Sequence, residues 1–258
     1  MAKLTEKSVL VKVVIPIYRN LNDEETASLA NTMQILGRHP IAFLLPESFK
    51  GEDFLAQYPQ AEAIRVNDKW LGTRCGIAGY NKMMKQKAFY ELFKTCEYIL
   101  ICHTDAWVFR DELTAWCSKN YDVVAAPFPM RRKYGYFPLK QILSLRRFLT
   151  PKSKLMHQDK YNRIGNGGLS LRRVDSFIKA SDEYRQEADF FDRFTDVHYA
   201  EDMFWALIPR HFHYPDAKEA LKFSFDSNPW LCYQLAHKQM PMGCHGFNHK
   251  DKRAFWKN

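Results

Sequence analysis

The chain has 258 residues, of which 46% are hydrophobic, and its formal net charge is +9. This length and composition are typical of one α/β domain with enough apolar material for a core. The sequence contains no run of about 18 apolar residues, so it predicts no membrane-spanning helix. The basic charge favours an anionic partner, such as nucleic acid, anionic lipid or a phosphorylated substrate.

The N-terminus and the cysteines bear on cellular location. The first residues, Met-Ala-Lys-Leu-Thr-Glu-Lys, lack the apolar segment of a secretory signal. The six cysteines show no Cys-x-x-Cys pair and no spacing typical of zinc sites. Several lie within apolar patterns, where a free cysteine behaves as a small hydrophobic residue. We therefore expect a cytoplasmic protein without disulfides.

Strands and helices are predicted to alternate from the N-terminus. Residues 9–18 are rich in β-branched side chains and predict a strand, which must end at Pro16 because proline lacks the amide hydrogen of a sheet ladder. Asn22 or Asp23 can cap a helix that begins at Glu24. Further strands are predicted at 41–45 and 63–66.

A long helical pattern runs from about Thr73 to Phe93. Its expected inward residues are Ile77, Tyr80, Met84, Phe89 and Leu92. It is followed by strands at 98–101 and 123–126, separated by a short helix that Asp111 can cap. This order predicts a largely parallel sheet with right-handed crossovers, in a single α/β domain that spans residues 1–258.

The apolar run from Tyr98 to Ile101 fits a strand buried on both faces, and it stops at His103-Thr104-Asp105. Open α/β sheets place ligands at the carboxyl ends of such strands. On an extended chain His103 and Asp105 lie on the same side, where they could hold a divalent cation against a diphosphate. The alternative is a hydrogen-bonded pair that closes the strand.

Three glycines surround one asparagine in Gly165-Asn166-Gly167-Gly168, directly before an alternating strand. Such a segment predicts either positive φ angles or a close approach of another group to the backbone. A simple tight turn or bulge is the alternative. A dinucleotide-binding loop is excluded, because the glycines precede a strand and not a helix.

Two more candidate sites lie further along the chain. Glu201 and Asp202 introduce an apolar helix that runs to about Ile208. Acids at a helix start are favoured by the macrodipole, but a carboxylate there can also act as a general base toward a hydroxyl group. His245 stands between two glycines on an expected loop, accessible as a ligand, although a surface histidine is the commoner case.

The segment from about 128 to 160 is predicted to be a basic insertion. Residues 123–158 contain no Asp or Glu, while apolar residues recur at roughly helical spacing among its lysines and arginines. The segment is either a solvated insertion or a basic amphipathic element, at 130–154, that contacts anionic lipid or an anionic acceptor. Its place near the predicted ligand edge also suits a lid.

These motifs, in this order, resemble the GT-A type of glycosyltransferase: Ile-Cys-His-Thr-Asp-Ala-Trp, Gly-Asn-Gly-Gly-Leu-Ser-Leu-Arg, Glu-Asp-Met-Phe-Trp and Gly-Cys-His-Gly-Phe. The set is particularly similar to a little-characterised bacterial family of glycosyltransferase-like proteins linked to surface polysaccharide synthesis. The resemblance covers roughly residues 8 to 250 and implies a Rossmann-like, mostly parallel sheet flanked by helices.

The resemblance also implies roles for individual residues. Asp105 matches the last Asp of the D-x-D motif, which contacts the Mn²⁺ or Mg²⁺ that bridges the nucleotide diphosphate, and His245 matches a further metal ligand. His103 stands where the first Asp would be, a departure that leaves its ligation open. The residues expected to face the nucleotide are Pro16, Ile17, Tyr18, Arg19, Arg74, Tyr80, Asn81 and Thr104, and those expected to line the sugar and acceptor pocket are Asn166, Gly167 and Gly168.

The function implied is transfer of a sugar from a UDP-linked donor to a hydroxyl of a saccharide or lipid-linked saccharide. Asp202 would act as base and give inversion, while Glu201 orients the acceptor or caps the helix. The alternatives are a basic nucleic-acid- or membrane-binding protein and a catalytically inactive relative. Nucleic acid is disfavoured, because the charge is concentrated in one insertion and no known binding motif is present. We expect a cytoplasmic enzyme that contacts the inner face of an anionic membrane.

Overall fold

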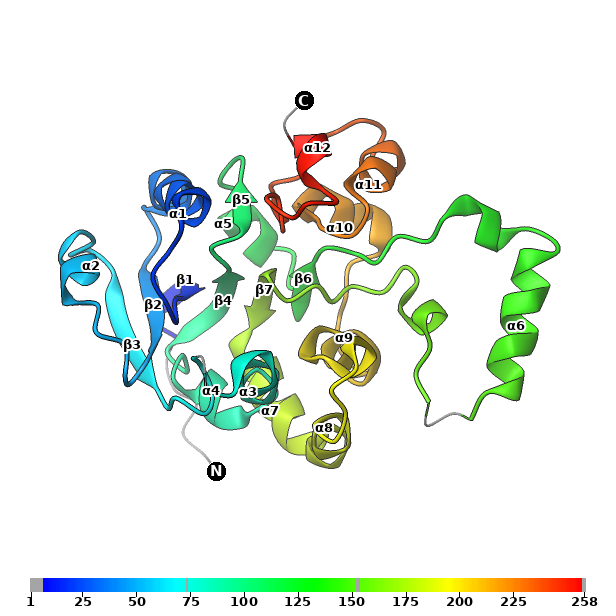
Figure 1. The fold of residues 1–258 in the computed structure, drawn as a ribbon, viewed down its shortest axis with the longest axis horizontal. Helices are drawn as coiled ribbons and strands as arrows, with labels where there is room; N and C mark the ends of the chain where they lie inside the picture. Colours follow the sequence, from blue (N-terminus) through cyan, green and yellow to red (C-terminus); the bar gives the residue numbers. More distant parts are fainter. Residues whose placement is uncertain (1–6, 73, 152–153, 257–258) are drawn as a thin grey trace.

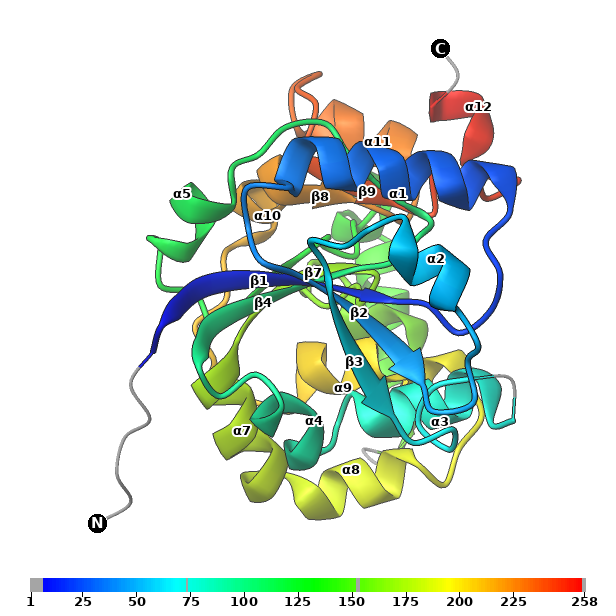
Figure 2. The same ribbon diagram turned by 90° about the vertical axis from the view of Figure 1, so that its left-hand side faces the viewer.

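The computed structural model describes residues 7–72, 74–151 and 154–256, and its centre is a six-stranded sheet with helices on both faces (Figures 1 and 2). Four strands run parallel: β1 (Val9–Pro16), β2 (Ile41–Pro46), β3 (Glu62–Val66) and β4 (Cys96–Cys102). The antiparallel β7 (Leu169–Arg173) lies between β4 and β6 (Val123–Ala125), which gives the order β3-β2-β1-β4-β7-β6. The expected mostly parallel α/β sheet is confirmed.

A second, three-stranded sheet of order β5-β9-β8 escaped the sequence analysis. It consists of β5 (Ala106–Val108), β8 (Ser224–Phe225) and β9 (Gly243–His245). In the antiparallel pair of β5 and β9, Ala106 lies opposite His245. His245 therefore ends a strand, and the expectation that it lies on a loop is wrong. Each strand is so short that its periodicity gives no signal in the sequence.

The helix from Asp23 to Leu36, α1, begins as expected. Asn22 is its N-cap and accepts a hydrogen bond from the amide of Glu25, whose carboxylate in turn accepts one from the amide of Asn22. This reciprocal arrangement satisfies two amides that the helix itself leaves unpaired.

The long helix predicted at 73–93 is wrong. The chain forms two short helices, α3 (Gly76–Met83) and α4 (Lys87–Glu91), because Gln86 between them is extended and Tyr90 donates its hydroxyl to the carbonyl of Met84. Two residues expected to face inward, Ile77 and Leu92, are exposed. Thr73 lies outside the described residues.

The other helices form layers over the sheet. They are α2 (Glu52–Ala56), α5 (Leu113–Cys117), α6 (Leu139–Leu149), α7 (Val174–Glu183), α8 (Arg185–Phe191), α9 (Glu201–Leu207), α10 (Ala217–Phe223), α11 (Pro229–Leu235) and α12 (Arg253–Trp256). One face of the sheet packs against α1 and α5, the other against α4, α7 and α9. Among the described residues, no helix has the length and apolar character needed to span a bilayer.

Residues 131–151 and 154–160 extend away from the sheet and form what we call the arm (Figure 1). The arm contains α6 between two short 3₁₀ turns at Arg132–Gly135 and His157–Lys160. No residue of α6 is buried, and the ring of Phe148 is 86% exposed. The segment predicted as a basic insertion therefore contains a helix with no buried residue.

A buried ion pair connects β7 to α9. Arg172 and Glu201, whose side chains are 2% and 4% exposed, lie 3.1 Å apart, and Arg172 also donates to the hydroxyl of Tyr90 at 2.8 Å. Burial of both charges is costly, so the pair is stable only while each partner keeps the other.

We expect Arg172→Met to lower the free energy of unfolding by about 3–5 kcal/mol, because it leaves the carboxylate of Glu201 buried and unpaired. The matched control is Arg173→Met on the same strand, whose pair with Glu97 is one third exposed on both sides. That variant is expected to lose less than about 1 kcal/mol. Urea denaturation measures both, and equal losses would contradict the assignment.

Candidate active site

A cavity of about 650 Å³ is lined by the segments that follow β1 and β4, by the glycine segment before β7 and by the start of α9. It brings together all the residues predicted for the site except Ile17 and Arg74. Ile17 is buried in the core beside β1, and Arg74 is exposed and does not line the cavity.

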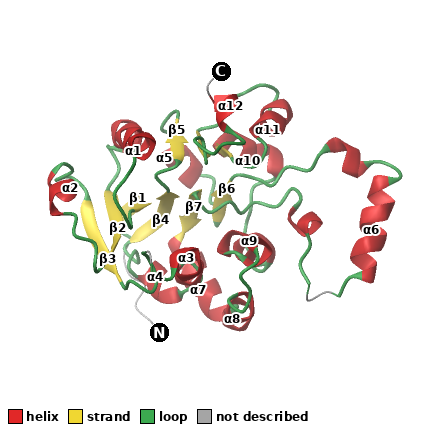
Figure 3. Cartoon of the chain, viewed as in Figure 1, coloured by secondary structure: helices red, strands yellow, loops and turns green. Residues whose placement is uncertain are grey.

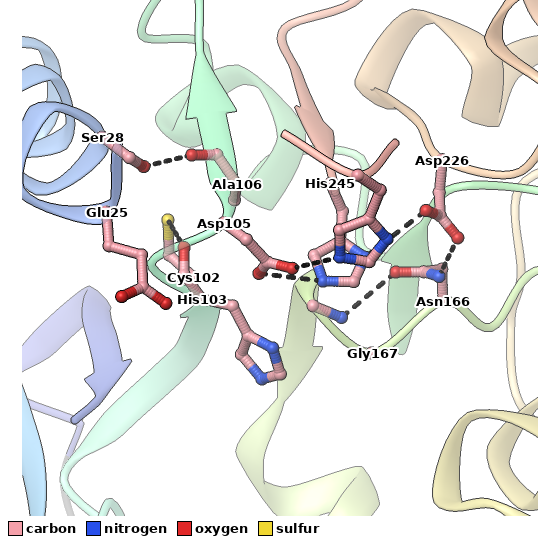
Figure 4. Close-up of polar contacts among 12 residues, drawn as sticks. Glu25, Ser28, Cys102, His103, Asp105, Ala106, Asn166, Gly167, Asp226 and His245 are labelled. Carbon is pink, nitrogen blue, oxygen red and sulfur yellow. Dashed lines mark hydrogen bonds and ion pairs between the residues drawn. The ribbon is translucent and has the colours of Figure 1, made fainter. Parts of the chain in front are cut away.

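Asp105 stands at the centre of a group of imidazoles (Figure 4). Its two carboxylate oxygens each lie 3.1 Å from a histidine Nε2, one of His245 and the other of His249. One candidate ligand atom from each of His103, Asp105 and His245 lies within 4.8 Å of the others. His103 and Asp105 lie near each other, but not because they share one side of an extended chain. Thr104 and Asp105 instead form a turn, which is closed by a 3.0 Å hydrogen bond from the amide of Ala106 to the carbonyl of His103.

A second layer of polar groups holds His245. Its Nδ1 lies 3.4 Å from Asp226, and Asp226 also accepts hydrogen bonds from Asn166 and Lys252. A carboxylate behind a histidine fixes the orientation of the ring, as it does in many metal sites. Asn166 thus links the glycine segment to the histidine and does not simply line the pocket.

The charges of the group follow from its burial. Burial alone would lower the pKa of His245, but its contacts with Asp105 and Asp226 outweigh this and raise the pKa to about 10. The pKa of Asp105 is lowered far below its ordinary value, because the neighbouring histidines outweigh the effect of burial. Burial lowers the pKa of His103 to about 4, so this ring is neutral at pH 7.

The glycine segment is required for close approach and not for positive φ angles. Gly167 and Gly168 both have ordinary φ angles, yet a Cβ on Gly168 would overlap the ring of His245. A Cβ on Gly167 would overlap the carboxylate of Glu201. Of the two possibilities left by the sequence, close approach is confirmed.

The two acids at the start of α9 have different surroundings. Glu201 is held by Arg172, so its expected role as a helix cap is wrong; Ala200 is the N-cap residue. Asp202 is half-buried and lines the cavity, with one oxygen 2.7 Å from the amide of Met203. Burial, together with the nearby charge of Glu201, raises the pKa of Asp202 to about 7.

The predicted nucleotide side of the cavity is also polar. Arg19 is bound by the carboxylate of Glu25, at 2.7 and 2.8 Å. The hydroxyl of Tyr80 lies 2.7 Å from Nε2 of His103, and the side-chain oxygen of Asn81 accepts from the amide of Glu201 at 3.4 Å. Tyr80 and Asn81 therefore link the metal-ligand candidates to the start of α9.

Sequence analysis missed several polar residues of the site. They are Glu25, Asp226, His249 and Lys252. The spacing of His245 and His249 is a signal that could have identified His249. Asp226 has no such signal, because only the pairing of β8 with β9 brings it to His245.

The residues present fit a divalent cation. Nitrogen and oxygen donors converge within bonding reach, and a second carboxylate orients one of the rings. Imidazole donors suit first-row transition metals better than Mg²⁺, which prefers oxygen. The set of His103, Asp105 and His245 therefore fits a first-row transition metal better than Mg²⁺.

Known structures share this fold. An active-site mutant of LgtC has 15% sequence identity and a TM-score of 0.58, over 91% of this chain and 86% of that one. The galactosyltransferase LgtC in complex with donor and acceptor sugar analogues has 13% sequence identity and a TM-score of 0.54, again over 91% of this chain and 86% of that one. The apo form of mouse xyloside xylosyltransferase 1 has 11% sequence identity and a TM-score of 0.54, over 95% of this chain and 98% of that one.

The fold is thus of the GT-A type found in glycosyltransferases. Residues 60–245 match a family described as "Protein of unknown function (DUF5672)", and the chain belongs to this family. No curated protein matches the sequence.

We expect Gly168→Ala to weaken Mn²⁺ binding by about tenfold or more, because the added methyl group displaces His245. Electron paramagnetic resonance of free Mn²⁺ measures the affinity. The control is Gly135→Ala in the arm, where a Cβ finds ordinary contact with Met130 and binding should be unchanged. Undiminished binding by Gly168→Ala in a folded protein would contradict a site at His245.

Proposed function

We propose that the protein is a glycosyltransferase that moves a sugar from a nucleotide-sugar donor to a hydroxyl acceptor. The observation that carries the proposal is the cavity itself, in which the histidine–carboxylate group at Asp105 and the carboxylate of Asp202 face one space in a GT-A fold. LgtC was solved with donor and acceptor sugar analogues, which supports saccharide ligands here. We treat residues 1–258 as one catalytic domain with the arm as its insertion.

The donor is proposed to be UDP-linked, with its diphosphate beside Asp105. Asp105, His245 and His103 would hold a divalent cation, which when bound would supply Lewis-acid stabilisation of the departing diphosphate. Tyr18 and Arg19 would lie along the nucleotide, and Asn166, Gly167 and Gly168 along the sugar and acceptor. Because the two glycines have no side chain, the sugar can approach the backbone closely.

Asp202 is the proposed general base. An ordinary aspartate is a weak base, whereas a pKa of about 7 lets Asp202 take a proton from a hydroxyl near neutral pH. Attack from the face opposite the diphosphate would invert the sugar. Glu201 is already held by Arg172, so it would support Asp202 through its charge and position.

Calorimetry with UDP, with and without Mn²⁺, tests the donor proposal directly. Metal-dependent binding that is lost in Asp105→Ala is the expected result. If no nucleoside diphosphate binds to the folded protein, with or without metal, the donor assignment is wrong.

Asp202→Asn is expected to reduce transfer by roughly 10²–10⁴-fold while UDP binding is retained. The matched control is Asp175→Asn, also in the first turn of a helix but outside the cavity. In the wild type, kcat/KM should rise with pH to a plateau above about 7. Equal loss of UDP binding and transfer would show that Asp202 is not the base.

The dependence of stability on pH reports the pKa of Asp202 without an activity assay. A carboxyl group with a raised pKa in the folded state stabilises the protein at low pH, and this contribution is lost as pH rises through about 7. The gain in Tm of Asp202→Asn over the wild type should therefore be larger at about pH 9 than at about pH 5.

We further propose that the enzyme works on cell-surface polysaccharide precursors in the bacterial cytoplasm, with the arm on the inner face of the membrane. Ile142, Leu145 and Leu149 recur at helical spacing on α6 and are exposed, as is Phe148. Arginines and lysines flank them, and residues 123–158 contain no acid. This combination is typical of helices that lie in the interface of anionic membranes.

Phe148→Ala is expected to weaken binding to vesicles that contain phosphatidylglycerol by about tenfold, because the ring loses burial in the lipid interface. Val197→Ala, also highly exposed but on the body of the protein, should bind as the wild type does. Sedimentation with anionic and with purely zwitterionic vesicles measures this. No preference for anionic vesicles would exclude the membrane role.

A further inference from the structure

A second cavity, of about 1030 Å³, lies between the arm and the segment from α8 to the start of α9. On the arm side it is lined by Tyr134, Arg146 and Tyr161, and on the other side by Phe194 and Tyr199. The amide of Leu155 donates to the hydroxyl of Tyr199 at 3.3 Å, which ties the two walls together. None of the residues proposed above for the donor lines this cavity.

Aromatic rings are gathered on both walls. Tyr134 and Tyr161 stack with ring centroids 5.6 Å apart and an interplanar angle of 13°. Phe194 and Tyr199 stack at 4.1 Å and 20°. A sugar ring has apolar C–H faces and polar edges, so its faces match aromatic rings in a wall that also carries polar groups. A large cavity with aromatic walls and a few polar groups is typical of a ligand site.

The charged groups of the cavity are mainly basic. Arg146 and Lys154 line it, while its one acid among the described lining residues, Asp196, lies 2.5 Å from His198. His157 has a pKa lowered by burial and by its basic neighbours, and its ring lies 3.2 Å from the hydroxyl of Tyr161. A guanidinium binds carboxylates and phosphates with paired hydrogen bonds. The charge therefore selects an anionic ligand.

The two cavities adjoin each other along the chain. Tyr199 lines the second cavity, the next residue, Ala200, lines the first, and Asp202 follows within the first turn of α9. A ligand that extends over this turn would enter the first cavity beside Asp202.

We propose that the cavity beneath the arm binds an anionic saccharide, a uronic acid or phosphorylated sugar unit of the acceptor. Its role as an acceptor site depends on the proposed function, whereas binding of the saccharide does not. Single-stranded nucleic acid also stacks on aromatic rings, but it needs a basic groove that follows its backbone over several nucleotides. Among the described residues that line this cavity, the only lysine and arginine are Lys154 and Arg146, which is too few to follow such a backbone.

The test is calorimetry with a tetramer of galacturonic acid, with maltotetraose as the neutral probe and an oligothymidylate as the nucleic acid probe. The uronate is expected to bind at least about tenfold more tightly than either, since charged hydrogen bonds add to ring stacking. Arg146→Gln should weaken it by about tenfold. The matched control is Arg185→Gln, an exposed change at the start of α8 that leaves binding unchanged.

Several outcomes would overturn the inference: no uronate binding, equal binding of maltotetraose, tighter binding of the oligothymidylate, or an undiminished affinity in Arg146→Gln. UDP titration of the same samples separates this inference from the proposed function. Arg146-dependent uronate binding without any UDP binding would support the cavity assignment and remove the donor proposal. UDP binding without uronate binding would support the donor proposal and remove the assignment of the second cavity.

Discussion

The ion pair between Arg172 and Glu201 joins the sheet to α9, and the position of the candidate base depends on it. Two opposite charges that are both buried stabilise the fold only weakly, because desolvation offsets most of their attraction. Their effect is instead to fix the start of α9 against β7. The retained charge of Glu201 then adds to burial in raising the pKa of the adjacent Asp202. A structural contact thus also contributes to the raised pKa of a cavity residue.

The opposite side of the cavity depends on strand pairing. Because β7 runs antiparallel to β4, Leu169 lies opposite Cys102, and the amide of His103 donates to the carbonyl of Gly168 at 2.9 Å. The pairing of β5 with β9 then brings His245 over the same glycine. Only a residue without a side chain fits between them. In Figure 3, β5 lies apart from the strands of the large sheet.

Much of the large sheet could be predicted from the sequence, because β1, β2 and β4 are mostly apolar runs. Asn22 also gives a clear capping signal for α1. Candidate site residues at the ends of strands and helices, such as Asp105 and Asp202, could also be proposed from the sequence. The break between α3 and α4 could not, since the carbonyl of Met84 at this break accepts a hydrogen bond from Trp205, which lies far along the chain. Asp226 and the small sheet were missed for the same reason: their positions follow from pairing between segments that are far apart in sequence.

His103 contributes an imidazole to the candidate site, where the D-x-D motif that this segment resembles has an acid. With His103 neutral, the negative charge comes from Asp105 and Asp226, and it is partly neutralised by the proton that they hold on His245. A cation that binds Nε2 of His245 must displace this proton, so its affinity should increase with pH. His103 can join through Nδ1 only in the tautomer whose Nε2–H donates to Tyr80. The group therefore offers two imidazoles when Tyr80 accepts that hydrogen bond, and one when Tyr80 donates it.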